Sequence, residues 1–186
     1  MNYNILFITA FIYFNSLAYS HPHLFIKSSS DFLIKDNFIK GIKISWTWDK
    51  WWSEDVINEC DKNNDNLFDE KETQLIYEDF FIGIEDFNYF TEITINNKKI
   101  KIAGVKDFKA FINSDKIVTY IFVIPIEVKI EDEVKISLAF NDETIYTAFD
   151  KNVVLKNITG YAYKNLKITN YSYYGVKIDF TIAKNK

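Results

Sequence analysis

The feature that most constrains the fold is an alternation of apolar and polar side chains along most of the chain. In residues 39–48 the side chains of Ile42, Ile44, Trp46 and Trp48 fall on one face, and this period of two is typical of a half-buried strand. Many short runs of this kind predict an antiparallel β-sandwich-like domain. The predicted strands are residues 23–27, 31–34, 39–48, 89–95, 99–102, 108–112, 117–124, 134–140, 145–149, 153–158, 166–172 and 176–182.

Two short polar segments, residues 35–37 and 96–97, separate neighbouring runs and predict hairpin turns. Pro125 follows the apolar run that ends at Ile124. Because proline cannot donate a hydrogen bond to a sheet, we expect Pro125 to end its strand or to lie at a sheet edge.

The alternation is interrupted once, after Trp48. Ser53 is followed by two acidic residues and predicts the N-cap of a first helix. A second amphipathic helix is expected to begin near Glu70. The apolar residues at helical spacing are Val56, Ile57, Cys60, Leu75, Ile76 and Phe80. The predicted fold is therefore mainly β, with one domain over residues 21–186 and a helix-loop-helix insertion at about residues 50–88.

Between the two predicted helices, residues 61–72 form a twelve-residue window rich in oxygen-bearing side chains. These side chains stand at positions 1, 3, 5, 9 and 12, which is the EF-hand spacing for calcium, a hard cation that takes six to eight oxygen ligands. Position 7 contributes a backbone carbonyl in this arrangement. The predicted calcium ligands are Asp61, Asn63, Asp65, Leu67, Asp69 and Glu72.

Position 6 of this window is Asn66, where an EF-hand usually has glycine. Asparagine tolerates positive φ better than most residues, so the cost should be modest. A lone loop of this kind is expected to bind calcium weakly, with a dissociation constant of about 10⁻⁴–10⁻³ M, as in extracellular modules. The alternative is a solvated polar loop without an ion. Cys60, next to the loop, is expected to be a small apolar core residue.

The composition excludes several function classes. All 22 basic residues are lysine and stand against 26 acidic ones, so the chain has neither arginine forks for phosphate or guanine nor a basic excess for nucleic acid. The chain has two histidines and one cysteine. A conventional Ser-His-Asp or Cys-His enzyme would have to recruit one of these histidines. We therefore expect a non-enzymatic protein.

Residues 1–20 have the properties of a secretory signal peptide. They carry no charged side chain, and Ile5 to Phe14 are apolar except for Thr9. This run is shorter than the roughly 20 residues that span a bilayer, and Ala18 and Ser20 fit a signal-peptidase site. We expect cleavage after Ser20 and a periplasmic or secreted protein without stable membrane insertion. The alternative is an uncleaved anchor.

Cleavage after Ser20 would leave His21-Pro22-His23 at the new N-terminus. The free amine and the imidazoles of His21 and His23 are ligands that suit Cu²⁺, Ni²⁺ or Zn²⁺. A carboxylate such as that of Asp49 could complete the set. The alternative is an ordinary polar terminus that leads into the first strand.

Several segments together resemble a bacterial exported family, domain-of-unknown-function family 1007, described as the periplasmic component of an uncharacterised ABC-type transport system. The chain departs from the family pattern at Trp48, where phenylalanine is usual, and at Asn66. The resemblance implies an association with the transport of nickel, cobalt or zinc, without an established biochemical activity. The segments that carry it are His21-Pro22-His23, Trp46-Thr47-Trp48-Asp49, the loop Asp61–Glu72, Phe87-Asn88-Tyr89-Phe90, the strand Phe122–Val128 and the stretch Asn141–Phe149.

These inferences lead to the expectation of a periplasmic calcium-binding accessory in the binding or transport of Ni²⁺, Co²⁺, Zn²⁺ or Cu²⁺. Its partner would be a membrane metal permease or an ABC-type transporter. The alternative is a structural or protein-interaction β domain in which calcium only stabilises the helical hairpin. A copper oxidase with a histidine brace fits least, because the chain has no further histidine to complete the usual ligands.

Overall fold

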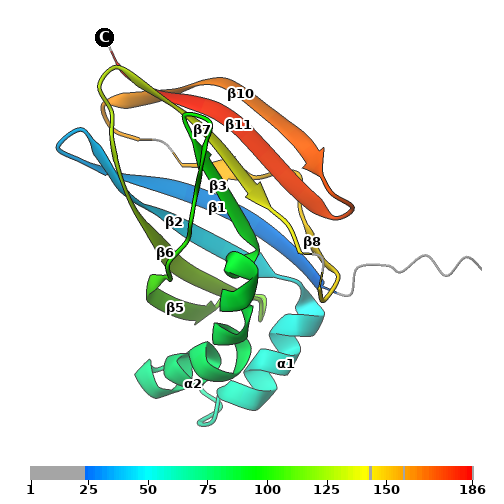
Figure 1. Ribbon diagram of the computed structural model, residues 1–186. Helices are drawn as coiled ribbons and strands as arrows, with labels where there is room; N and C mark the ends of the chain where they lie inside the picture. The colour runs from blue at the N-terminus through cyan, green and yellow to red at the C-terminus, as the bar shows by residue number, and fades with distance from the viewer. Residues whose placement is uncertain (1–23, 143, 157, 186) are drawn as a thin grey trace, which may run out of the picture.

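Two β-sheets that lie face to face make up most of the molecule (Figure 1). The computed structural model describes residues 24–142, 144–156 and 158–185. Sheet A contains β1 (Leu24–Lys35), β2 (Phe38–Trp48), β5 (Lys106–Ile112), β6 (Val118–Lys129), β8 (Thr147–Phe149) and β9 (Val154–Leu155). Sheet B contains β3 (Thr91–Ile95), β4 (Lys98–Ile100), β7 (Glu133–Phe140), β10 (Tyr161–Tyr171) and β11 (Gly175–Lys184).

Antiparallel pairing predominates in both sheets. The strand order is β5-β6-β2-β1-β8 in sheet A, where β9 also pairs with β1, and β10-β11-β7-β3-β4 in sheet B. Among the strands of the described residues, only β8 and β9 run parallel to their neighbour, β1. The mainly β class predicted from the alternation is therefore confirmed, with two sheets dominated by antiparallel pairs.

The hairpin of β1 and β2 lies in the middle of sheet A. Its turn residues Asp36 and Asn37 have φ angles of 52° and 62°, as a two-residue turn with the right-handed strand twist requires. The turn predicted at residues 35–37 is confirmed. β1 continues through Ser28, Ser29 and Ser30, so the two predicted runs form one strand, which begins at Leu24 in the described residues. In the sequence, these polar serines interrupt the apolar alternation and suggest two strands. In the structure, Ser28 and Ser30 are nevertheless buried.

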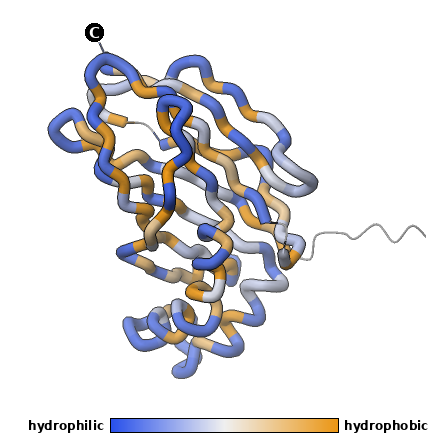
Figure 2. The backbone as a smooth tube through the Cα atoms, in the orientation of Figure 1, coloured by the Kyte–Doolittle hydropathy of each residue, from blue (hydrophilic) through white to orange (hydrophobic). Residues whose placement is uncertain are grey.

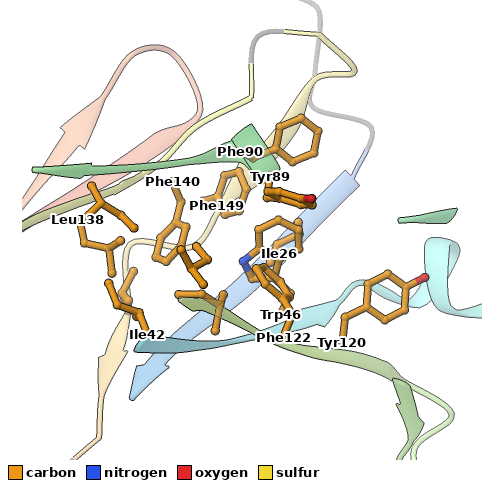
Figure 3. Packing of buried hydrophobic residues seen from close by; sticks show 14 of the residues in the cluster. Ile26, Ile42, Trp46, Tyr89, Phe90, Tyr120, Phe122, Leu138, Phe140 and Phe149 are labelled. Carbon is orange, nitrogen blue, oxygen red and sulfur yellow. The ribbon is translucent and has the colours of Figure 1, made fainter. Parts of the chain in front are cut away.

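The core between the sheets consists of aromatic rings and branched aliphatic side chains (Figure 3). Trp46 is fully buried, and its ring centre lies 4.9 Å from that of Phe122 and 5.9 Å from that of Phe149. Further along the interface, Phe32 of β1 meets Phe180 of β11 edge to face at 5.4 Å. Such aromatic pairs add to the stabilisation from burial. The two sheets are thus held together by one continuous apolar core.

Three helical segments lie between β2 and β3: α1 (Lys50–Cys60), α2 (Glu70–Phe80) and the 3₁₀ segment η1 (Ile82–Phe90). They extend from one end of the sheets, and the turn between α1 and α2 is strongly hydrophilic (Figures 1 and 2). The second helix begins at Glu70, where the sequence predicted it. Within the described residues, no helix has the length and apolar character needed to cross a membrane.

The predicted N-cap of the first helix, Ser53, is wrong. α1 begins earlier, and the N-cap is Asp49, whose Oδ1 accepts a hydrogen bond from the Trp52 amide at 2.9 Å. Ser53 is fully buried inside the helix. Its hydroxyl donates to the Asp49 carbonyl at 2.6 Å and accepts from the Val118 amide at 2.9 Å. Ser53 therefore attaches α1 to β6.

Where the backbone is irregular, one further expectation is met and one fails. Pro125 lies inside β6, opposite Gly41 and next to a register shift in β2. Because β5 pairs with β6 only as far as Val123, β6 has a single neighbour at this point, so Pro125 does not end its strand but lies at a sheet edge, as expected. The strand predicted to begin at residue 89 begins later, because Tyr89 does not belong to β3. Asn88, Tyr89 and Phe90 have φ angles of 52°, 51° and 47°, a left-handed turn that is costly for aromatic residues. Packing of Tyr89 on Phe81, with ring centres 5.6 Å apart, offsets this cost.

Candidate metal centre

The loop between α1 and α2 is the segment that the sequence singles out as a calcium site, and its second half is fixed by a helix cap. Asp69 is the N-cap of α2. Its Oδ1 accepts from the Glu72 amide at 2.9 Å, and Glu72 Oε2 accepts from the Asp69 amide at 3.0 Å. This reciprocal pair is a capping box. It holds the Glu72 carboxylate at the start of the helix, facing the loop.

Asp61 organises the first half of the loop. Its side chain is buried, with 6% of the residue exposed. Its Oδ1 accepts from the Asp65 amide at 3.2 Å, and its Oδ2 accepts from the Asn66 amide at 3.0 Å. Both carboxylate oxygens of Asp61 thus accept hydrogen bonds from backbone amides later in the loop. These bonds curve the backbone of the loop around the Asp61 side chain.

Glu72 joins the two ends of the window. The other carboxylate oxygen, Oε1, accepts from the Lys62 amide at 2.8 Å and from the Asn63 amide at 3.4 Å. Glu72 is 5% exposed. Positions 1 and 12, which the sequence predicts as ligands of one ion, are therefore both buried and lie at the point where the loop closes.

The remaining predicted ligands lie on the exposed part of the loop. Asn63 Oδ1 accepts from the Asp65 amide at 2.9 Å, and Asp65 Oδ1 accepts from the Leu67 amide at 2.8 Å. The Asn63 side-chain amide also donates to Asp65 Oδ2 at 3.0 Å. The side chain of Leu67 is exposed, so this residue would contribute only its backbone carbonyl.

The backbone conformation at position 6 agrees with the sequence expectation. Asn66 has a φ of 64°, and Asn64 has a φ of 58°. Asparagine visits the left-handed region more readily than most residues because its side chain can hydrogen-bond locally. The Asn66 side chain also accepts a hydrogen bond from Lys116 in the β5–β6 turn. This contact links the loop to sheet A. It could not be predicted from the local sequence, because the two residues are 50 positions apart.

The conformation of Asn66 can be tested by comparing Asn66→Val with Asn66→Gly. Both variants lose the Lys116 contact, so the difference between them isolates the backbone. We expect Asn66→Val to be less stable than Asn66→Gly by about 1–2 kcal/mol or more, because a β-branched residue is poorly tolerated at positive φ. Urea unfolding of the two proteins measures the difference. Equal unfolding midpoints would contradict the left-handed conformation.

The donor set of the loop is chemically suited to a hard cation, since its members are carboxylates, one amide oxygen and a backbone carbonyl. In the structure, the side-chain oxygens of Asp61, Asn63, Asp65, Asp69 and Glu72 accept hydrogen bonds from backbone amides. Within residues 24–142, 144–156 and 158–185, no three His, Cys, Asp or Glu side chains are grouped as a metal would require. Binding therefore requires loop carboxylates to exchange amide hydrogen bonds for the ion.

Cys60, immediately before the loop, is fully buried. Burial is the main cause that raises the pKa of its thiol to about 11. The thiol is therefore protonated at neutral pH, and a protonated thiol is neither a nucleophile nor a good metal ligand. This environment agrees with the expected role of a small apolar core residue.

The predicted transition-metal ligands His21 and His23 lie outside the described residues. The structure does place Asp49, the carboxylate suggested to complete this ligand set, next to the start of the described chain. Asp49 Oδ2 accepts from the Phe25 amide at 2.6 Å, while Oδ1 caps α1. The carboxylate thus ties the beginning of β1 to the beginning of α1.

Asp142, which the sequence analysis quoted only as part of the stretch Asn141–Phe149 and without a role, organises the loop before β8. It is 4% exposed, and its carboxylate accepts from the Thr144 hydroxyl at 2.7 Å and from the Thr147 amide at 2.8 Å. Burial by itself raises the pKa of Asp142, but the hydrogen bonds from Thr144, Thr147 and Ile145 outweigh it and hold the pKa below its ordinary value. An aspartate two residues before a threonine is too common a pattern to have signalled this role.

This hydrogen bonding predicts an acid-dependent loss of stability. Because the folded-state pKa of Asp142 is depressed, its contribution is present above the ordinary aspartate pKa of about 4 and is lost as the pH falls through the lower folded value. Asp142→Asn should cost about 1–3 kcal/mol at pH ~7, since buried donors lose their acceptor. Urea unfolding at pH ~7 and pH ~3 should show the gap to the parent protein narrowing in acid. A gap independent of pH would contradict this role.

Comparison with known families identifies the family of this chain. The profile of the family described as "protein of unknown function (DUF1007)" matches residues 6–169. The chain therefore belongs to the DUF1007 family, as the resemblance of its motifs indicated. This membership assigns neither an activity nor a ligand.

One curated relative has a description that names no activity. The chain is 28% identical over 109 residues to an uncharacterized 15.5 kDa protein in the trpE 3′ region of Spirochaeta aurantia. The alignment covers 56% of this chain and 77% of the relative. No solved structure gives a significant match. The function therefore has to be inferred from the chain's own residues.

Proposed function

We propose that this protein is an exported, periplasmic calcium-binding protein that serves as a non-enzymatic accessory in transition-metal binding or transport. Its partner is a membrane metal permease or an ABC-type transporter. The helical hairpin is EF-hand-like and is inserted into an antiparallel β-sandwich-like domain. The calcium ligands are Asp61, Asn63, Asp65, the carbonyl of Leu67, Asp69 and Glu72.

The observation that carries the calcium proposal is the closure of the loop by Asp61 and Glu72. Both carboxylates are buried, and each accepts backbone amides from the segment between them. Two buried carboxylates at the ends of one short loop are costly unless their charge is compensated. Calcium compensates it and matches an all-oxygen donor set. The ion would thereby stabilise the join between α1 and α2.

Thermal unfolding with and without calcium tests this proposal. For a dissociation constant of about 10⁻⁴–10⁻³ M, ~10 mM calcium stabilises the native state by about 1.4–2.7 kcal/mol. For a chain of this size, that corresponds to a rise in Tm of about 3–10 °C. Magnesium at the same concentration is the control. Because magnesium demands octahedral geometry and dehydrates reluctantly, it should have a smaller effect.

The transition-metal proposal is supported by the chemistry of His21 and His23 and by the position of Asp49 beside Phe25. We expect the chain beginning at His21 to bind Ni²⁺, Cu²⁺ or Zn²⁺ in a calorimetric titration. The double variant His21→Ala/His23→Ala should lose this binding, because the two imidazoles are the only ones in the chain. Absence of binding by the parent chain would remove transition-metal handling from the proposal.

A second candidate is a structural or protein-interaction domain in which calcium only stabilises the hairpin. It is favoured by the contacts that attach the hairpin to sheet A, Ser53 to Val118 and Lys116 to Asn66. A calcium-dependent Tm without transition-metal binding would select this candidate.

A further inference from the structure

A groove lies between helix α2 and strand β5, and we call it the α2–β5 groove. It encloses about 540 Å³, a volume typical of ligand sites. One wall is the side of α2 that carries Thr73, Gln74 and Tyr77, and the other wall is formed by residues 105–111. Figure 1 shows α2 below β5, at the end of the molecule where the helical insertion leaves the sheets.

The second wall of the groove is the free edge of a sheet. β5 is the last strand on its side of sheet A, and within the described residues it pairs only with β6. Successive side chains of a strand point to opposite faces, yet the consecutive residues 105–111 all line the groove. A hollow that touches both faces of a strand runs along its edge. The groove therefore borders the row of backbone amides and carbonyls that β5 does not use for β6.

Aromatic side chains flank this edge. Phe111 is 47% exposed, while Phe68, Tyr77 and Phe108 are partly buried. The ring centres of Tyr77 and Phe108 lie 5.3 Å apart, so this ring contact joins the two walls. Backbone groups without a strand partner, next to apolar rings, match an extended peptide: its backbone pairs with the edge, and its alternate side chains fill the apolar surface.

Charge defines which peptide fits the strand wall. Lys106 and Lys109 are exposed, and neither forms an ion pair with another described residue. They stand against one acidic residue of the same strand, Asp107. The other acidic residues of the groove, Asp69 and Glu70, belong to the helix wall. A strand with acidic side chains along β5 therefore complements the lysines, whereas a lysine-bearing strand would meet like charge.

The same charges disfavour a second copy of this chain as the occupant. Every described strand already lies in a sheet, and the only edge strands longer than three residues are β5 and β10. β10 carries the exposed residues Lys164 and Lys167. Pairing β5 of one copy with β5 or β10 of another would bring lysines close to lysines, which destabilises a sheet. The occupant is therefore a strand from a different protein.

We propose that the α2–β5 groove binds an extended, acidic peptide segment of a partner protein, which pairs with β5 as an additional strand of sheet A. The peptide backbone pairs with the free edge, its carboxylates lie near Lys106 and Lys109, and its apolar side chains contact Phe108 and Phe111. The proposal is independent of calcium and of the histidines.

Hydrogen exchange in the presence of a short blocked peptide tests the proposal. The probe is acetyl-Glu-Val-Glu-Val-Glu-Val-amide, whose alternation places carboxylates on one face of a strand and apolar side chains on the other. With saturating peptide, we expect exchange of backbone amides in β5 to slow severalfold, because amides at the free edge gain a partner. The edge strands β4 and β10 are internal controls and should keep their exchange rates.

Two pairs of substitutions separate the groove from the rest of the surface. Lys109→Glu reverses a charge of the strand wall, and Phe111→Ala removes its exposed ring, so each should weaken binding of the probe severalfold in a calorimetric titration. The matched controls are Lys27→Glu and Phe25→Ala, which change exposed residues of β1 outside the groove. They should bind the probe as the parent does. Thermal unfolding of each variant shows that it is folded.

Four results would overturn the proposal. The first is no saturable binding of the probe at concentrations up to ~1 mM, and the second is binding that leaves β5 exchange unchanged. The third is equal affinity for a probe in which lysine replaces glutamate, or for one that is N-methylated at alternate residues and cannot pair as a strand. The fourth is protection of β5 that appears without peptide and rises with protein concentration, which would identify a second copy as the occupant.

Discussion

Glu72→Gln should remove the rise in Tm that calcium produces in the parent protein. Glu72 is the only predicted ligand that would give the ion two carboxylate oxygens, and it closes the loop through the Lys62 and Asp69 amides. A glutamine keeps one oxygen acceptor for these amides but loses the negative charge and one oxygen. The expected result is a shift near zero in ~10 mM calcium, against about 3–10 °C for the parent.

The matched control is Glu78→Gln, on the exposed side of the same helix. It removes the same charge from α2 without touching the loop, so the calcium-induced shift should be retained. Comparing each variant with and without calcium cancels any change in its baseline stability. A full shift in Glu72→Gln, or loss of the shift in both variants, would contradict the assignment of the loop.

Trp46→Ala should lower the free energy of unfolding by about 3–5 kcal/mol, the usual cost of removing a large aromatic side chain from a core. Trp46 contacts rings from sheet A and from the helical insertion. Its ring centre lies 6.2 Å from that of Phe90, which ends η1, and 6.4 Å from that of Phe81, which follows α2. The substitution therefore leaves a cavity where sheet A meets the helical insertion.

Urea unfolding of Trp46→Ala beside Trp51→Ala measures this effect. Trp51 is 78% exposed, so its removal should change the free energy of unfolding by about 0.5 kcal/mol or less. The same chemical change is thus compared at a buried and at an exposed site. Similar midpoints for the two variants would show that Trp46 is not at the centre of the core.

The part of the fold that could be predicted from the sequence is the part governed by local periodicity. Alternation identified the face of β2 that carries Ile44 and Trp46, and the polar segment at residues 35–37 marked the turn at Asp36. Periodicity failed where polar residues occupy buried positions, as at Ser28, and where Asp49 and Ser53 are both acceptable caps. Choosing between these caps depends on Ser53 meeting the Val118 amide, and this contact is invisible in the local sequence.

In the candidate site, too, local features could be predicted from the sequence and long-range contacts could not. The spacing of Asp61 through Glu72 is local, and the left-handed conformation of Asn66 followed from it. The contacts of Asp49 with Phe25 and of Lys116 with Asn66 join residues 24 and 50 positions apart. Pairs at such separations are brought together by sheet topology, which the residues themselves do not encode locally. The sequence therefore predicted the loop but not its attachment to the sheets.

Calorimetric titration of the chain beginning at His21 with calcium measures the proposed binding itself. We expect one calcium ion per chain with a dissociation constant of about 10⁻⁴–10⁻³ M, and no binding heat above dilution in Glu72→Gln. A parent chain that takes up no calcium at concentrations well above ~10⁻³ M would contradict it.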